Sequence, residues 1–336
     1  MANPVLVEVT RGSRVESRHR GSIAVFDADG RSVFSAGDTH EPVYPRSAVK
    51  AIQALPLIES GAADALGYGE RELALAQASH GGEPGHVATA AAMLHAAGLD
   101  ERALECGSQW PSHSASAAAL SAVGKTPSAL HNNCSGKHAG FLAIACHEGF
   151  QTAGYVDPGH PVQKLVRSIL ESLTGAVHAA DGYGIDGCSI PTYAVPLTAL
   201  ATAFARFGSG RGLAPERAVA ARRLFDAAIA EPFYIAGTGR FCSQAITAMK
   251  GDALVKGGAE GVCCGTIPDA GLGIAIKCDD GASRAAETVM ANLLLALGRR
   301  DDATLRRWAN PPLLNRRDIP IGEIRLAEGA LAGLRP

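Results

Sequence analysis

The hydrophobic pattern at both ends of the chain is typical of β-strands. Residues 4–10 and 21–36 are rich in valine and isoleucine, and Asp29-Gly30 within the second segment marks a tight hairpin turn. Towards the other end, residues 253–264 and 272–278 show the same β-rich composition on either side of a turn. We therefore expect strands from both chain ends to pair in one antiparallel sheet.

Between these segments the spacing of apolar residues changes to the helical period. One helix is predicted to begin close to Ser47 and to bend or end near Pro56. Further helices are predicted over residues 70–78, 85–97, 114–123, 136–147, 162–173, 215–229 and 282–297. The predicted fold class is α+β, with an antiparallel sheet built from both chain ends and flanked by helices, and with an inserted, mostly helical subdomain.

This order of elements predicts two domains with the active site at their interface. Residues 1–60 and 230–336 would form a discontinuous sheet domain, and residues 61–229 a mainly helical subdomain. The sequence has no fixed-period repeat and no low-complexity linker. The two parts are therefore expected to pack closely against each other.

The charge and the apolar content exclude several classes of function. Lys and Arg number 31 against 33 Asp and Glu, so the chain lacks the basic surplus that binding to nucleic acid or to an anionic membrane requires. No apolar stretch reaches the roughly 20 residues of a membrane span. The first ten residues lack the basic and then apolar order of a secretory signal, so a cytoplasmic location is expected. In that reducing compartment the eight cysteines are expected to be packing residues, metal ligands or nucleophiles.

Lysine is scarce, with seven residues in the chain, and each position is therefore informative. Lys50 follows Ser47 by three residues, a spacing that places both side chains on one face of the predicted helix. A neutral lysine there is a general base for a serine nucleophile, and the free N–H groups at the helix start would stabilise an oxyanion. In the alternative reading, Ser47 caps the helix and Lys50 is a solvated helix lysine.

Two further segments concentrate chemically useful groups. Lys256 lies in the strand-like sequence LVKGGAEG, where two glycines permit a ligand to approach the backbone. Cys134 and Lys137 lie in the polar run HNNCSGKH, and Cys188 lies in the loop-like sequence DGCSIP. Two cysteines and one nitrogen could hold a zinc ion with one open position, although the chain contains neither a Cys-x-x-Cys nor a His-Glu-x-x-His motif.

The order of six motifs is more specific than any of them alone. They are SAVK, ASHGGEP, HNNCSGKHAG, DGCSIPTYAVPL, AGTGRF and LVKGGAEGV. Together they resemble the Rhizobium etli-type L-asparaginase family, also called the asparaginase II family, over nearly the whole chain. The resemblance implies a serine β-lactamase-like and glutaminase-like fold, usually a homodimer, that hydrolyses L-asparagine to L-aspartate and ammonia.

The resemblance also implies roles for individual residues. The residues expected to be catalytic form two serine–lysine tandems, which are Ser47 with Lys50 and Ser79 with Lys256. The residues expected to bind Zn²⁺, with water as the fourth ligand, are Cys134, Lys137 and Cys188. The residues expected to bind the substrate are Arg46, His80, Glu83 and Asp186. Two thiolates already neutralise a zinc dication, so the metal is expected to fix the pocket wall or the substrate rather than to activate water.

These residues predict acyl transfer, in which Lys50 deprotonates Ser47 and the serine attacks the side-chain amide of asparagine. Two other functions stay open at this stage. SAVK and KGG also resemble motifs of serine β-lactamases and penicillin-recognising hydrolases, and the same pocket could serve a non-catalytic amino-acid-binding or zinc-binding protein. Asparagine and glutamine differ by one methylene group, and the sequence does not distinguish between them.

Overall fold

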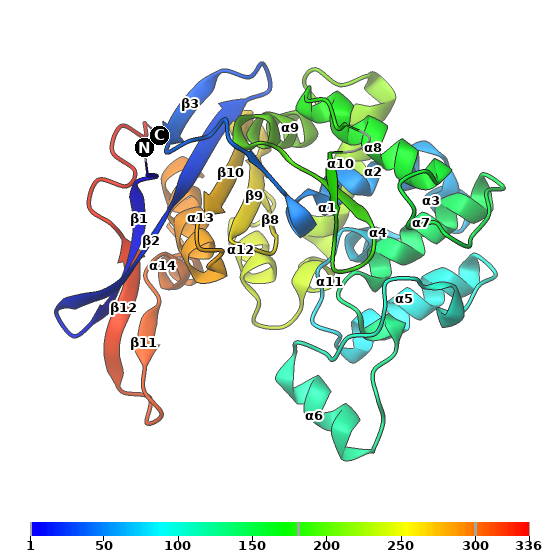
Figure 1. Cartoon of the computed structure of the whole chain (residues 1–336), viewed down its shortest axis with the longest axis horizontal. Coiled ribbons are helices and arrows are strands. Elements are labelled where there is room, and N and C mark those ends of the chain that lie inside the picture. Colours follow the sequence, from blue (N-terminus) through cyan, green and yellow to red (C-terminus); the bar gives the residue numbers. More distant parts are fainter. Residues whose placement is uncertain (1, 180–181, 299–300, 336) are drawn as a thin grey trace.

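The structure is a computed structural model that describes residues 2–179, 182–298 and 301–335. Residues 1, 180–181, 299–300 and 336, which fall within the predicted domain ranges, lie outside the described part. Figure 1 shows strands from both chain ends on one side and helices from the middle of the chain on the other.

The main sheet has eight strands within the described residues, and all of its pairings are antiparallel. Its strands are β1 (Val5–Arg11), β2 (Arg14–Asp27), β3 (Ser32–Ala36), β8 (Leu254–Gly257), β9 (Val262–Ile267), β10 (Leu272–Cys278), β11 (Pro312–Leu314) and β12 (Pro320–Leu326). Their order is β11-β12-β1-β2-β10-β9-β8, and β3 also pairs with β2. The predicted α+β class, with one antiparallel sheet built from both chain ends, is confirmed.

Two small antiparallel pairs lie outside this sheet. They are formed by β4 (Pro42–Val43) with β7 (Val195–Pro196) and by β5 (Tyr183–Ile185) with β6 (Pro191–Tyr193). The helices that position the site are α1 (Lys50–Gln53), α2 (Leu55–Glu59), α4 (Glu70–Ala76), α5 (Pro84–Ala96), α7 (Ser135–His147), α8 (Pro161–Thr174), α9 (Leu197–Ser209), α10 (Pro215–Ala230), α11 (Pro232–Ala236), α12 (Phe241–Met249) and α13 (Ser283–Leu297). The remaining ones are α3 (Ala62–Ala65), α6 (Ser114–Ala122) and α14 (Ala303–Ala309).

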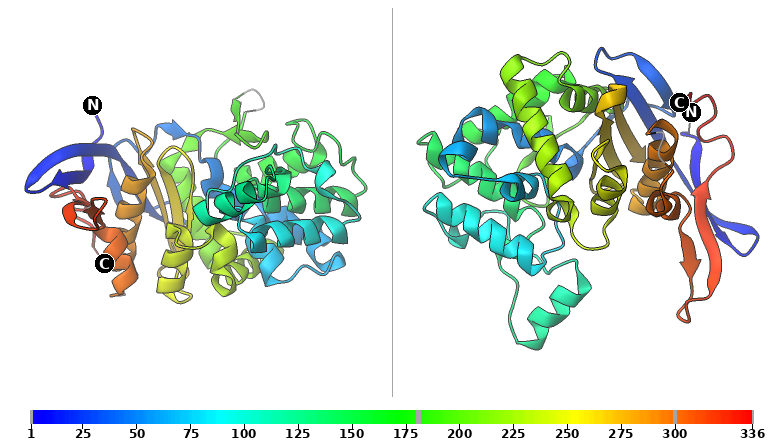
Figure 2. Two further views of the ribbon diagram at one scale, coloured as in Figure 1. Left: turned by 90° about the horizontal axis from the view of Figure 1, so that it is seen from below. Right: turned by 180° about the vertical axis from the view of Figure 1, so that it is seen from behind.

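Alternate residues of the central strands face two different hydrophobic cores. Ala24 and Ala275 face the core that includes α9, whereas Ile23 and Ile276 face the core that includes α13. This alternation follows from the two-residue period of a β-strand. The edge-on view in Figure 2 shows helices on both faces of the sheet. Lys256 pairs in register with Cys264, so its side chain belongs to the face that meets the helical part of the molecule.

A single glycine determines how closely α9 packs on the sheet. A Cβ atom at Gly273 in β10 would collide with the backbone of Ala201 and Ala205 in α9. The absent side chain therefore permits the direct contact between helix and strand.

Helix α7 lies at the centre of the helical part. Its residues from Ser135 to Ala145 are all buried, so it is surrounded by protein on every side. The HNNCSGKH segment leads into this helix, which places Cys134 and Lys137 at the buried end of the central helix. No helix in the described part of the chain has the length and apolarity of a membrane span.

The predicted helix that begins near Ser47 is divided into three short pieces. A 3₁₀ turn covers Arg46–Val49, and α1 and α2 follow. Pro56 lies in the first turn of α2, where its missing N–H costs no hydrogen bond. Proline therefore begins a new helix here instead of ending the first one. The proposed domain boundary near residue 60 stays a prediction.

Candidate active site

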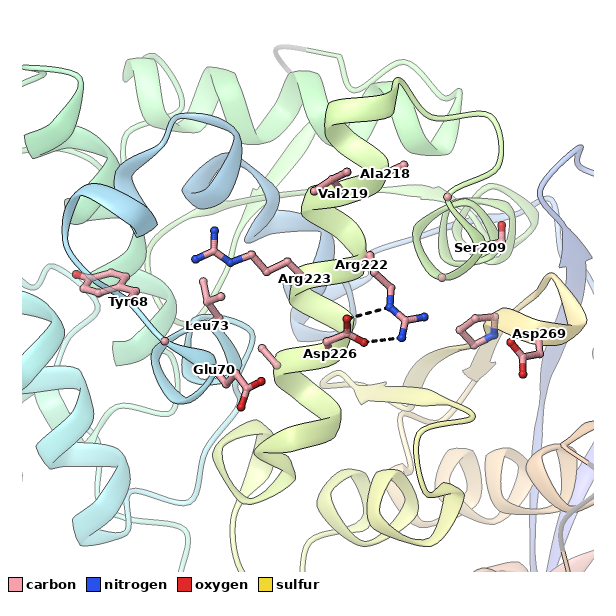
Figure 3. Close-up of a pocket in the computed structure, with 15 residues that line it drawn as sticks. Tyr68, Glu70, Leu73, Ser209, Ala218, Val219, Arg222, Arg223, Asp226 and Asp269 are labelled. Carbon is pink, nitrogen blue, oxygen red and sulfur yellow. Dashed lines mark hydrogen bonds and ion pairs between the residues drawn. The ribbon is translucent and has the colours of Figure 1, made fainter.

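Two cavities of the molecule differ in whether they contain the predicted site residues. One, of about 840 Å³, lies between α4, α10 and the end of α9 (Figure 3). Its charged side chains include Arg222, which pairs with Asp226, and Arg223, which pairs with Asp64. It contains none of the predicted site residues, and both of these arginines are already neutralised by an aspartate. Its size alone therefore does not make it the site.

A second cavity, of about 250 Å³, is lined by three of the four predicted catalytic residues, which are Ser47, Ser79 and Lys256. It lies where the 3₁₀ turn at Arg46–Val49, the segment after α4 and the edge strand β8 meet. The strand–helix–strand order of the chain thus brings together residues more than 200 positions apart in the sequence. This cavity is the candidate active site.

Two lysines converge on Ser79 in this cavity. Lys50 Nζ lies 3.0 Å and Lys256 Nζ 2.8 Å from Ser79 Oγ. Both lysines are almost completely buried. The predicted contact between Ser79 and Lys256, which no sequence spacing could reveal, is therefore present in the structure.

The two lysines have different surroundings. Lys50 Nζ donates to three acceptors, which are the Ala78 carbonyl, Ser79 Oγ and Cys134 Sγ. This is the full donor capacity of an ammonium group. For Lys256, burial and then the nearby charge of Lys50 lower the pKa to about 7. Lys256 can therefore be neutral, and act as a base, near neutral pH.

The predicted contact between Ser47 and Lys50 is not formed. Within the described residues, no hydrogen bond joins their side chains, and all three Lys50 donors are directed elsewhere. The turn at Ser47 is 3₁₀ rather than α-helical, and Arg46 before it has a left-handed φ of 51°. Ser47 and Lys50 are still one turn apart, because the Lys50 N–H donates to the Ser47 carbonyl. The contact is missing because the Lys50 amine is directed to Ala78, Ser79 and Cys134 instead of to the Ser47 hydroxyl. Ser47 itself is partly exposed and lines the cavity.

The three predicted zinc ligands lie together in the core. Lys137 Nζ is 3.1 Å from Cys188 Sγ, and Cys188 and Cys134 are close enough that each shifts the pKa of the other. All three side chains are buried. Lys50 joins this cluster to the serine pair, because its Nζ is also 3.0 Å from Cys134 Sγ.

Only one of the two thiols is favoured as a thiolate. The hydrogen bond from Cys188, opposed by burial and assisted by the charge of Lys50, holds the pKa of Cys134 well below its ordinary value. The same hydrogen bond, together with burial, raises the pKa of Cys188. Burial acts to lower the pKa of Lys137, but the neighbouring sulfur charge raises it overall. Two sulfurs and one nitrogen, all buried, form a donor set that suits zinc.

No cluster of three or more His, Cys, Asp and Glu side chains in the described ranges has the geometry of a metal site. The candidate zinc site therefore depends on the lysine as its third ligand. Lys137 would have to lose its proton to bind a metal.

Arg46 and Asp186 form an ion pair. Arg46 Nη2 and Nε lie 2.9 and 3.1 Å from one Asp186 oxygen. Although burial acts to raise the pKa of Asp186, the hydrogen bonds from Arg46 hold it below its usual value. The sequence predicted both residues as substrate-binding groups, and the structure shows that each neutralises the other.

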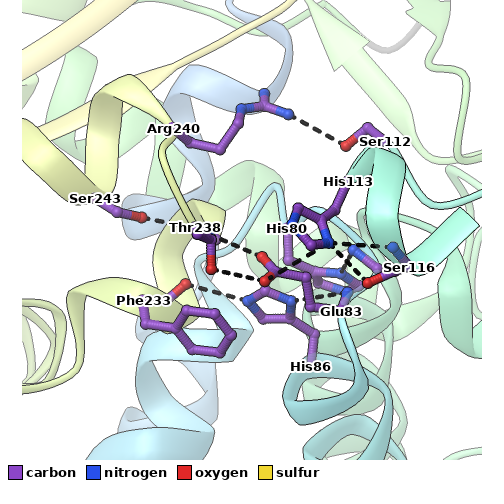
Figure 4. A network of polar contacts seen from close by, with 12 residues as sticks. His80, Glu83, His86, Ser112, His113, Ser116, Phe233, Thr238, Arg240 and Ser243 are labelled. Atoms are coloured by element: carbon purple, nitrogen blue, oxygen red, sulfur yellow. Dashed lines mark hydrogen bonds and ion pairs between the residues drawn. The ribbon is translucent and has the colours of Figure 1, made fainter.

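His80 and Glu83 also have partners within the protein (Figure 4). His80 Nδ1 accepts a hydrogen bond from the Gly82 N–H, and its Nε2 lies 2.9 Å from Ser135 Oγ. Burial lowers the pKa of His80 well below its ordinary value, so the ring is neutral. Within the described residues, both side chains serve the protein's own contacts, and neither lines the catalytic cavity.

Glu83 instead holds the loop between α11 and α12. Its two carboxylate oxygens accept hydrogen bonds from the Thr238 N–H at 2.8 Å and the Thr238 hydroxyl at 2.7 Å. The preceding residue, Gly237, has a φ of +113°, and a Cβ atom there would collide with Glu83. The loop conformation therefore requires glycine, which gives the AGTGRF motif a physical cause.

Several residues that line the cavity are not among the predicted site residues, and Arg240, Cys242 and Glu287 carry the chemically distinctive groups among them. Cys242 Sγ accepts a hydrogen bond from the Gly257 N–H at 3.1 Å. Arg240 stands in the AGTGRF motif, which was recognised without a role for this residue. Glu287 lies in no recognised motif, so nothing in the linear sequence indicated it.

A family model described as L-asparaginase II matches residues 7–326. The chain belongs to the L-asparaginase II family. The match extends from β1 to the last residue of β12 and includes every predicted site residue. The suspected resemblance to this family is therefore confirmed, and L-asparaginase II membership makes the protein an asparaginase-type amidohydrolase. The comparison with curated proteins finds no match.

Solved structures similar to this L-asparaginase II chain are distant. A protein described as Mglu is 15% identical, with a TM-score of 0.39, and the match covers 84% of this chain and 67% of that one. Mglu in 4.3 M NaCl gives 15% identity, a TM-score of 0.39, and coverage of 83% and 61%. A β-lactamase from Mycobacterium bovis is 12% identical, with a TM-score of 0.38 and coverage of 82% and 94%. The chain thus spans about two thirds of the length of Mglu, and family membership rests on the family model alone.

Proposed function

We propose that the protein hydrolyses L-asparagine to L-aspartate and ammonia through a serine acyl-enzyme. The observation that carries the proposal is the convergence of Lys50 and Lys256 on Ser79 in a cavity that Ser47 also lines. A base with a pKa near 7 beside a serine pair is what nucleophilic catalysis on an amide requires.

In the first half-reaction, Ser47 Oγ attacks the side-chain amide carbon of asparagine. Ser47 is proposed as the nucleophile because its hydroxyl makes no hydrogen bond within the described residues, whereas Ser79 Oγ is already engaged by two amines. The Ser47 proton passes through Ser79 to neutral Lys256 and then to the leaving nitrogen. The C–N bond breaks, ammonia leaves, and a β-aspartyl ester remains on Ser47.

In the second half-reaction, water attacks this ester and the same relay takes the proton from the water. The C–O bond to Ser47 breaks, L-aspartate forms, and the proton returns to the Ser47 oxygen. Lys50, with three acceptors, serves as a fixed cation. Its charge helps to keep Lys256 neutral, because two ammonium groups at one serine repel each other.

We propose that Cys134, Lys137 and Cys188 hold Zn²⁺. The buried S, S, N donor set supports this assignment. The bound metal would fix the position of Cys134, and hence of Lys50, beside the cavity. The protein's own part in the reaction stays with the serines and lysines.

We also propose that the protein is a cytoplasmic homodimer. The balanced charge, the absence of a membrane-spanning helix in the described residues and the resemblance to asparaginase II enzymes support this proposal.

Ammonia release from L-asparagine, L-glutamine and buffer alone tests the proposed reaction, with nitrocefin as the β-lactam comparison. We expect asparagine turnover at least about ten times that of glutamine, since one methylene is worth about 1–3 kcal/mol in a fitted pocket. Ser47→Ala should lose at least about 1,000-fold in kcat, and Ser79→Ala about 100- to 10,000-fold. Ser121→Ala, an exposed serine on α6, is the control.

Mass spectrometry of the acid-quenched reaction identifies the serine that carries the aspartyl group. An adduct on Ser79 that persists in Ser47→Ala would exchange the two proposed serine roles. Full activity in both serine variants, or nitrocefin hydrolysis without ammonia release, would refute the proposed function.

A further inference from the structure

The catalytic cavity contains charged groups that the proposed reaction does not use. The charged residues among those that line it are Lys256, Arg240 and Glu287. Lys256 is bound to Ser79, so one cation and one anion remain. This is the charge pattern that complements a zwitterion.

Among the residues that the structure describes, Glu287 has no hydrogen-bond or ion-pair partner. Its carboxylate makes no hydrogen bond and no ion pair within the described ranges, although Arg240 is near enough to affect its titration. Burial raises the pKa of Glu287 to about 7 because an incompletely solvated carboxylate is costly without a counter-charge. Ser283 and Ala286 line the cavity beside it, so one face of the first turns of α13 is turned to the cavity.

Arg240 has no carboxylate within 4.0 Å in the part of the chain that the structure describes. Its Nη1 lies 3.2 Å from Ser112 Oγ, and the loop that carries it is fixed by the bonds between Glu83 and Thr238 (Figure 4). The guanidinium is exposed and its position is supported by the protein. Such a group can bind a carboxylate with little loss of conformational freedom.

Arg46 and Asp186, which the sequence predicts to bind the substrate, are less suited to bind the charged groups of a zwitterion. Arg46 and Asp186 already neutralise each other, and binding a charged ligand would break their ion pair. Neither of them lines the cavity, whereas Arg240 and Glu287 do.

We propose that Glu287 binds the α-ammonium group and Arg240 the α-carboxylate of the substrate. The inference rests on the proposed function and names the substrate class, which is a free α-amino acid that carries its amide in the side chain. Both ionic groups of such a substrate lose water when they enter the cavity, and each then needs a counter-charge. Amides that lack an ammonium group would leave Glu287 unpaired and are therefore excluded.

Binding of three non-reacting ligands tests the assignment by calorimetry at pH 8.5, where Glu287 is ionised. L-aspartate carries both groups, succinate lacks the ammonium group, and β-alanine lacks the α-carboxylate. We expect the wild-type protein to bind L-aspartate more tightly than either of the others. In Glu287→Gln the preference for L-aspartate over succinate should fall about 10- to 100-fold. In Arg240→Gln the preference for L-aspartate over β-alanine should fall by a similar factor.

Two further variants guard against a general effect on folding. Glu148→Gln removes an exposed carboxylate at the end of α7 and should leave both preferences unchanged. Glu287→Asp keeps the charge and should retain part of the preference over succinate. An equal loss of affinity for all three ligands in Glu287→Gln, or an unchanged preference, overturns the inference.

The outcomes separate this inference from the proposed function. A protein that binds L-aspartate in a Glu287-dependent way but releases no ammonia from asparagine retains this binding site and lacks the proposed activity. A protein that hydrolyses asparagine while Glu287→Gln discriminates as well as the wild type retains the activity and lacks this binding site. Equal wild-type affinity for L-aspartate and succinate also contradicts the inference.

Discussion

Lys50 and Lys256 show how the same residue type takes two roles at one serine. Both lie within 3.0 Å of Ser79 Oγ, but Lys50 has three acceptors and Lys256 is bound to Ser79 and to the Gly257 carbonyl. Lys50 directs all three of its N–H donors at fixed acceptors, and burial next to its charge favours the neutral form of Lys256. The hydrogen-bond partners of Lys50 and the burial of Lys256 therefore determine which lysine serves as the cation and which as the base.

The pKa of Lys256 predicts how activity depends on pH. The neutral amine is the active form, so kcat/KM should be low below pH 6 and should rise as pH increases through about 7. Lys256→Arg, which stays protonated throughout this range, should lose at least about 100-fold in kcat/KM above pH 8. Initial rates of ammonia release between pH 5 and 9 measure both effects.

Glu287 ionises in the same range, so its contribution must be separated. The rise near pH 7 should persist in Glu287→Gln if Lys256 is the base. Disappearance of the rise in Glu287→Gln, with its retention in Lys256→Arg, would assign the titration to the glutamate.

The zinc assignment predicts a metal content that depends on Cys134. The protein purified without chelator should release about one zinc per chain on denaturation, and Cys134→Ser should release at least ten times less because a thiolate ligand is lost. Cys146→Ser removes a partly exposed thiol outside the cluster and is the matched control. A zinc content that is equal in both variants contradicts the assignment, and a chromogenic chelator provides the readout.

At the level of single elements, the contact between α9 and β10 depends on the missing side chain at Gly273. Gly273→Ala should lower the free energy of unfolding by about 3 kcal/mol, because the new methyl group would overlap backbone atoms that cannot rotate away. Urea unfolding followed by circular dichroism measures this effect.

Gly140 in α7 provides the matched control. A Cβ atom there would meet Leu57 and Ala76 at 3.4 and 3.6 Å, which are ordinary contact distances. Gly140→Ala should therefore be neutral or stabilising by up to about 1 kcal/mol, since alanine favours the helix. Equal destabilisation by the two substitutions would show that the close contact of α9 is not responsible.

Elements with a strong local pattern could be predicted from the sequence. The hairpin at Asp29-Gly30 and the strands β9 and β10 were found because valine, isoleucine and turn residues mark them. Strands β11 and β12, and the first hairpin at residues 11–14, were missed. Residues 11–14 are polar and exposed, and β11 and β12 are short and interrupted by proline and glycine, so none of them carries a clear strand pattern. These segments owe their conformation to pairing, of β12 and β2 with β1 and of β11 with β12.

The same distinction applies to the site. The serine–lysine and cysteine motifs were visible as short runs, but the pairing of Ser79 with Lys256 across 177 positions was available only through the family resemblance. Glu287 was invisible, because a single glutamate on an amphipathic helix has no local signal. The partners of Arg46, His80 and Glu83 likewise required the three-dimensional structure.

At the scale of the whole molecule, the proposed homodimer should be visible in the molar mass of the protein in solution. Light scattering coupled to size exclusion should give twice the 34.5 kDa of one chain at micromolar concentration. A mass that stays at 34.5 kDa at the highest accessible concentration would refute the dimer.

Because strands from both chain ends alternate in one sheet, the sheet cannot be completed early while the chain is being synthesised on the ribosome. β2 is paired with β1 on one side and with β10 on the other, and β1 also needs β12. More than 200 residues must be translated between β2 and its later partner. The nascent N-terminal strands therefore keep open edges until translation is nearly finished, and the native sheet must form late and slowly. During that interval the open strand edges of one nascent chain can pair with those of other nascent chains on the same messenger RNA. Chaperones would have to bind these edges to prevent such pairing.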